Sequence, residues 1–239
     1  MKTPVKYVAG GAALAALGYA AFAGAKWARY GHASRARRPD EQDPLLDRFM
    51  PIYDIAERHH IRILAPPDVT LAAARDLNIE ESGVVRGLFK ARELVMGGMP
   101  AEAPLPSGLL AAALSLGWGI LADEVDREIV LGAATKPWEP NPVFRDLLPR
   151  DFRSFAEPGF VKIAWTLRAD PVAAGESIFR SETRAIATDA DARAKFRRYW
   201  ALVSPGVLLI RRAMLAPIKA EAERRVAPLT VGPEMVTTS

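Results

Sequence analysis

The sequence contains no cysteine and only three histidines among its 239 residues. The absence of cysteine excludes disulfide bonds, thiolate zinc sites and cysteine nucleophiles. The histidines stand at positions 32, 59 and 60 without an HExxH motif or a spaced His/Asp cluster, so the sequence predicts no metal site and no cofactor. It also lacks the GxGxxG loop, the Walker motif and the GxSxG elbow. Their absence disfavours nucleotide chemistry and serine-hydrolase chemistry.

Acidic residues are missing from the first 38 positions, which hold seven Lys and Arg residues. The remaining positions carry 25 basic and 28 acidic residues, so the net charge of +4 comes from a short N-terminal arm. A nucleic-acid-binding domain needs its cations on a folded face. The charge distribution therefore predicts no nucleic-acid partner, and the composition, half hydrophobic and a quarter charged, is that of a globular protein.

One long uncharged run is present at residues 7–25, between Lys6 and Lys26. As a helix it would span roughly 28 Å, close to the hydrocarbon core of a bilayer. We therefore expect residues 1–30 to form a single transmembrane anchor in the inner (cytoplasmic) membrane, in contact with lipid through residues 7–25. Basic residues concentrate after the run, which predicts that the following domain faces the cytoplasm. Cleavage near Ala25 followed by export, and a peripheral helix, are the alternatives.

Three further segments follow the anchor. Residues 31–51 are polar and interrupted by proline, as is typical of a juxtamembrane linker. Residues 52–226 contain no repeat and no low-complexity break, which indicates one domain. Residues 227–239 are expected to be a disordered tail.

Hydrophobic periodicity predicts the elements of the domain. Alternating apolar and polar residues predict five strands, at 53–63, 118–124, 128–135, 160–168 and 176–188. Helical spacing and capping residues predict helices at 67–77, 82–96, 107–116 and, after Asp189 or Asp191, along a long C-terminal stretch to Ala222. The proline-rich residues 136–158 are expected to form a loop that covers a cavity.

This order of elements predicts an α+β fold, in which a curved antiparallel sheet wraps around the last helix and leaves a cavity between them. The pieces IRILAPPDVTLAAARDL, GESIFRSETRAIATD and ARAKFRRYWALVSPGVLLIRRAMLAPIKAEAER lie within residues 52–226. On these pieces the chain resembles the START-like (SRPBCC) superfamily, the helix-grip fold of the major birch pollen allergen and of bacterial cyclases. It is also similar to uncharacterised bacterial members of that group. The resemblance implies the fold and transfers no catalytic residue.

Polar candidates for a site lie on two strands. Glu57 and His59 share a strand face with Ile61, and on a cavity wall they would hydrogen-bond a ligand or act as an acid/base pair. Arg180 belongs to a row of charges that we interpret as a solvated face, and turned inward it would contact an anionic ligand. The candidate cavity residues are Glu57, His59, Ile61, Trp118, Trp165, Phe179, Arg180, Tyr199, Trp200 and Val203.

The last helix is rich in basic residues, Arg211 and Arg212 among them. We interpret these as its solvated outer face, with contact to anionic lipid as the alternative.

The sequence thus predicts a membrane-tethered START-like domain that binds a hydrophobic or amphipathic small molecule, such as a lipid, an isoprenoid or a polyketide-like compound. A cyclase- or aromatase-like enzyme acting on such a ligand is one alternative, and a non-catalytic interaction module with a filled core is another. The oligomeric state stays open.

Overall fold

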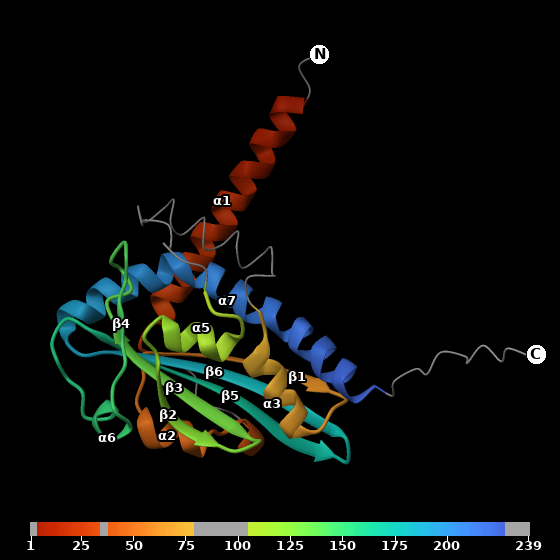
Figure 1. Cartoon of the computed structure of the whole chain (residues 1–239). Coiled ribbons are helices and arrows are strands. Elements are labelled where there is room, and N and C mark those ends of the chain that lie inside the picture. The colour runs from red at the N-terminus through yellow and green to blue at the C-terminus, as the bar shows by residue number, and fades with distance from the viewer. Residues whose placement is uncertain (1–3, 34–37, 79–104, 228–239) are drawn as a thin grey trace, which may run out of the picture.

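The computed structural model describes residues 4–33, 38–78 and 105–227 and has an α+β fold (Figure 1). Its elements are α1 (Pro4–Arg29), η1 (Pro39–Glu41), α2 (Pro44–Phe49), β1 (Ile55–Ile63), α3 (Pro67–Asp76), α5 (Leu109–Ser115), β2 (Gly119–Glu124), β3 (Glu128–Thr135), β4 (Phe144–Arg145), α6 (Pro149–Phe152), β5 (Val161–Ala173), β6 (Glu176–Ala187) and α7 (Ala190–Val226).

One antiparallel sheet organises the domain, with strand order β1-β6-β5-β3-β2 and with β4 paired to β3. The five strands predicted from alternation are present. The sixth, β4, has two residues and lies in the segment predicted as a loop, where such a short pairing leaves no periodicity to detect. The predicted helix at 82–96 and the tail from residue 228 lie outside the described residues.

The face of the sheet that α7 covers is here called the inner face. Trp165 of β5 stands opposite Thr183 of β6 and Leu131 of β3, and all three point to this face. Helices α3, α5 and α7 pack against it and form the largest buried cluster, which includes Leu71, Leu131, Leu167, Phe179 and Ile218. Each such side chain contributes about 1.5–3 kcal/mol through burial.

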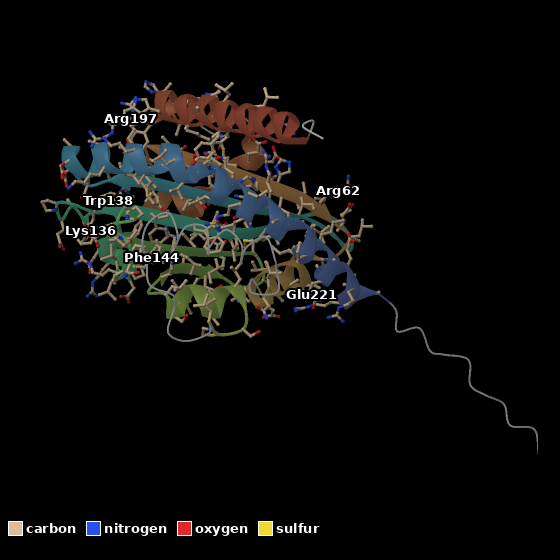
Figure 2. The ribbon with its side chains drawn as sticks, turned by 90° about the horizontal axis from the view of Figure 1, so that it is seen from above. Arg62, Lys136, Trp138, Phe144, Arg197 and Glu221 are labelled. Carbon is tan, nitrogen blue, oxygen red and sulfur yellow. The ribbon has the colours of Figure 1, made fainter. Side chains whose placement is uncertain are left out.

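Helix α7 is the long helix that the sheet grips. The side chain of Asp189 accepts a hydrogen bond from the Ala192 amide at 2.8 Å, so it is the predicted cap. The helix then runs unbroken to Val226, with two prolines inside it. Its buried positions recur every three or four residues, from Phe196, Trp200 and Ser204 to Met214, Ile218 and Ala222. Figure 2 shows Arg197 near the end of α7 that lies beside α1, and Glu221 near the opposite end.

The opposite, outer face is covered by residues 38–50, which precede β1. The sequence predicts a linker at 31–51, but the structure places η1 and α2 there, with Leu46 fully buried and Met50 only 2% exposed. Phe152 of α6 completes this outer cluster, so residues 136–158 also contain more structure than a loop. These apolar residues are few and lie among polar ones, which is why the pattern reads as a linker.

Helix α1 projects from the body of the molecule, and its C-terminal part lies against α7 (Figure 1). Arg197 donates a hydrogen bond to the carbonyl of Trp27 at 3.0 Å. Its guanidinium carbon lies 4.3 Å from the centre of the Trp27 ring. Leu14 and Leu17 are 73% and 67% exposed.

Among the described residues, one helix, α7, is long and apolar enough to cross a membrane by length and composition. Its buried stripe makes α7 part of the domain core.

Candidate functional site

The structure divides the ten predicted cavity residues between two faces. Strand register places Glu57, His59, Ile61, Trp165 and Phe179 on the inner face. Arg180 points to the outer face, because it stands on β6 between Phe179 and Ser181, which point inward. Its side chain therefore lies on the opposite side of the sheet from that of His59, although both residues line one pocket of about 200 Å³. The other four residues are Trp118, which lies just before β2, and Tyr199, Trp200 and Val203 on α7.

Trp165 forms the floor of the candidate site. Its indole Nε1 donates a hydrogen bond to the Ser181 hydroxyl at 2.8 Å, which fixes the plane of the ring. Trp118 meets it edge-on, with ring centres 6.1 Å apart, and Trp118 in turn stacks on Phe144. The result is a rigid aromatic wall on the inner face of the sheet.

Arg211 of α7 lies over this wall. Its guanidinium carbon is 3.9 Å from the centre of the Trp165 ring, a close cation–π contact. Position 211 follows Ser204 by two turns and precedes Met214 by one, so it falls on the buried stripe of the helix. The interpretation of Arg211 as part of a solvated face is therefore wrong.

Polar atoms without hydrogen-bond partners also occur on the inner face and on α7, and His59 is close enough to Arg211 to feel its charge. The Nε2 atom of His59 and the Oγ atom of Ser204 are buried, and neither atom takes part in a hydrogen bond. Ser204 is fully buried as a residue. The hydroxyl of Thr135, at the end of β3, is a third such atom. Buried polar groups in folded proteins are normally paired, so each of these atoms needs an explanation.

The protonation states of the site follow from burial. Burial, and then the positive charge of Arg211, lower the pKa of His59 from 6.5 to about 4, so the imidazole is neutral at pH 7. Burial also lowers the pKa of Arg211, to about 10, which leaves it a cation at pH 7. The inner face thus holds one positive charge beside a neutral imidazole with a free nitrogen.

Glu57 and Trp200 line a pocket of about 540 Å³ between α1 and β1. Lys26 of α1 forms an ion pair with Glu57 and lies 6.0 Å from the Trp200 ring. Because Glu57 is already paired, it is a poorer candidate for an acid/base role than His59. This pocket borders the inner face at the point where α1 reaches the domain.

A second polar cluster lies on the outer face, where the sequence predicts only solvated charges. Asp43 forms a side-chain hydrogen bond with Glu128, and Thr166 donates to Glu128 at 2.8 Å. Burial, and then the negative charge of Asp43, raise the pKa of Glu128 to about 8. Arg168 donates to the carbonyls of Gln42 and Asp40 at 2.7 and 2.9 Å. These contacts hold residues 38–50 on the sheet.

Two pockets adjoin this outer cluster, of about 200 and 680 Å³. Arg168 and Arg180 line both of them. Their cations are each paired with Asp170, and Arg180 also with Asp40. The cluster therefore satisfies its own charges, whereas the inner site does not. No group of three His, Asp or Glu side chains that would suit a metal ion occurs among the described residues.

Sequence reasoning missed Arg211 and Ser204. The signal was present, because both positions fall on the apolar stripe formed by Phe196, Trp200 and Met214. Arg211 was grouped with the neighbouring basic residues of α7, although its position matches the apolar period of the helix. The pairing of Asp43 with Glu128 left no signal, because the two residues lie on segments far apart in the sequence.

The architecture is that of a helix-grip fold, in which a curved antiparallel sheet holds a long C-terminal helix. No protein-family model and no curated protein matches the chain. Among solved structures, protein CV1439 from Chromobacterium violaceum is 14% identical, with 65% of this chain and 96% of that chain covered and a TM-score of 0.26. The Zhui aromatase/cyclase from Streptomyces sp. R1128 is also 14% identical, with 72% and 96% covered and a TM-score of 0.26. CalU16 from Micromonospora echinospora is 11% identical, with 71% and 84% covered and a TM-score of 0.25. Likenesses of this size assign no function to the chain.

Proposed function

We propose that this protein binds an apolar or amphipathic small molecule between α7 and the inner face of the sheet. The observation that carries the proposal is the set of unpartnered polar groups in an apolar environment, namely Arg211, His59 Nε2 and Ser204 Oγ. A buried polar group without a hydrogen bond costs about 1–3 kcal/mol, and a buried charge costs more. A ligand that pairs with these groups accounts for their presence.

The surroundings of these groups suit an apolar ligand body. Trp165 and Trp118 form one wall, and Ile61 and Met214 pack in the same cluster. Small-molecule sites in proteins are mostly apolar, with a few polar groups that orient the ligand. The inner face combines both features around Arg211.

In this proposal α1 is the membrane tether, and the domain faces the cytoplasm. Support comes from the uncharged run at 7–25 and from the exposure of Leu14 and Leu17 on the described part of α1. The tether would hold the binding site beside a bilayer, where apolar compounds concentrate. Protease treatment of intact and of permeabilised cells, with a tag after residue 239, tests this orientation. Digestion of the tag in intact spheroplasts would refute it.

Native mass spectrometry of the full-length protein, released from a mild nonionic detergent, tests ligand binding. We expect a discrete added mass that survives purification or appears after incubation with a lipid extract. Ser204→Leu, which fills a buried position of α7, should remove the added mass. Ala220→Leu, which adds the same side chain at an exposed position of α7, should retain it. A folded protein that stays empty under both conditions would refute ligand binding and favour the interaction module.

An enzyme acting on such a ligand is the second candidate, and His59 is the observation that favours it. A neutral imidazole with a free Nε2 atom is able to accept a proton from a bound substrate. Once the ligand mass is known, incubation with the wild type distinguishes the two functions. A carrier returns the ligand unchanged, whereas an enzyme converts it. His59→Gln should then abolish conversion while binding persists.

A further inference from the structure

Arg211 is partly buried, and it differs from the fully buried arginines of the described domain in having no carboxylate partner. Arg184 is 3% exposed and pairs with Glu182 at 2.7 Å. Arg168 is 5% exposed and pairs with Asp170 at 2.9 Å. Within the described residues, the interaction recorded for the Arg211 guanidinium is its stacking on Trp165. In the part of the chain that the structure describes, the buried cations Arg168 and Arg184 are neutralised on the outer face, whereas the partly buried Arg211 has no counter-ion on the inner face.

The groups around Arg211 add hydrogen-bonding capacity without adding negative charge. His59 is neutral, and Ser204 offers a hydroxyl whose oxygen has no partner. Helical side chains lean toward the N-terminus of their helix, so the Arg211 side chain extends in the direction of Ser204. Arg212 and Lys26 also act on His59, but Arg212 is exposed and Lys26 is already paired with Glu57. Among the described residues, the inner face thus combines a guanidinium that has no carboxylate partner with two neutral polar groups that have no hydrogen bond.

We propose that the ligand of this inner site is an anionic amphiphile, whose single carboxylate or phosphate head pairs with Arg211 while its apolar body lies along Trp165. The proposal rests on the proposed binding function and specifies the chemical class of the ligand. A guanidinium suits both head groups, because its parallel N–H donors match two oxygens of a carboxylate or a phosphate. The hydroxyl of Ser204 and the imidazole of His59 are the neutral groups available to the remaining oxygens.

The charge of the head group is tested with three probes that share one alkyl chain. Decanoate, decyl phosphate and decanol differ in the head group, and their binding to the full-length protein in nonionic detergent is measured by native mass spectrometry over a range of concentrations. We expect decanoate or decyl phosphate to bind about 10- to 100-fold more tightly than decanol, as charge-assisted hydrogen bonds allow. The tighter of the two anions distinguishes a carboxylate ligand from a phosphate ligand.

Two neighbouring arginines provide matched variants. Arg211→Met removes the inner cation but keeps an apolar side chain over Trp165, and it should lower anion affinity about 10-fold or more without weakening decanol binding. Arg212→Met makes the same change at an exposed position of α7 and should leave the affinities unchanged. Arg211→Lys retains the cation, and we expect it to preserve the preference for anions even if Arg211→Met fails to fold.

The outcomes separate the two proposals. Equal binding of decanol and of both anions by the wild type would refute the anionic ligand and leave ligand binding standing. Anion binding that is lost equally in Arg211→Met and Arg212→Met would also refute it, because surface charge would then explain the preference. Binding of no probe, together with an empty protein after incubation with lipid extract, would refute the binding function itself.

Discussion

Replacing Glu128 by glutamine should stabilise the protein in alkaline solution. Glu128 is 3% exposed, forms a side-chain hydrogen bond with Asp43, and accepts one from Thr166 at 2.8 Å. Its raised pKa means that the folded protein keeps it protonated at neutral pH. Glutamine imitates that protonated form, since it retains an oxygen for Thr166 and supplies an N–H donor for Asp43.

The size of the effect follows from the pKa. Burial beside Asp43 raises the pKa of Glu128 from 4.5 to about 8, and burial raises that of Asp43 as well. The folded state therefore holds the proton more tightly than the unfolded chain. The resulting stabilisation is complete below the unfolded pKa and is lost as the pH rises through the folded one. For Glu128 this loss amounts to on the order of 4 kcal/mol between mildly acidic and alkaline solution.

Thermal unfolding followed by tryptophan fluorescence in detergent, across a series of pH values, measures this loss. The Tm of the wild type should fall by roughly 8–16 °C from mildly acidic to alkaline solution, and Glu128→Gln should remove most of that fall. Glu124→Gln, at the exposed position opposite Glu128 on β2, is the control and should follow the wild type. A wild-type Tm that does not change over this range, or a Glu128→Gln variant less stable than the wild type throughout, would refute the reasoning.

Two further substitutions and one spectroscopic measurement test the fold and the site. Asp189→Ala removes the cap of α7 and should lower the free energy of unfolding by about 1 kcal/mol, measured by urea denaturation. Gly132→Ala would place a Cβ 2.5 Å from Leu121 and 2.7 Å from Phe152, so it should cost about 1–3 kcal/mol in the same assay. Nitrogen-15 NMR of the imidazoles should find His59 neutral at pH 6, because burial lowers its pKa to about 4. A His59 that is mostly protonated at pH 6 would contradict the buried site.

The first strand and the long helix were predictable from their hydrophobic periods, whereas β3 is buried on both faces and was recognised as part of a hairpin. β1 alternates over Ile55–Ile63, and α7 repeats its buried residues every three or four positions. The two sides of the sheet were harder to predict. Alternation places Arg180 and Glu182 together but does not say whether that face is covered, and here residues 38–50 cover it.

The candidate site was predictable only in part. Glu57 and His59 were identified as candidates, since polar residues on a strand face shared with Ile61 are unusual in a core. Arg211 of α7 was not identified as a site residue, because its role depends on its contact with Trp165, and the sequence does not show that contact. Contacts of this kind depend on the packing of helix against sheet, which local periodicity does not record.

The strand order also has a consequence for how the chain is synthesised. β1 is an edge strand whose partner is β6, and Arg58 of β1 pairs with Glu182, which stands 124 positions later in the sequence. At translation rates of about 5–20 residues per second, β1 leaves the ribosome roughly 6–25 s before its partner does. Pairing of distant segments also slows folding after release. During that interval the unpaired edge of β1 is open to other chains, so β6 is the element whose arrival protects the nascent protein from aggregation.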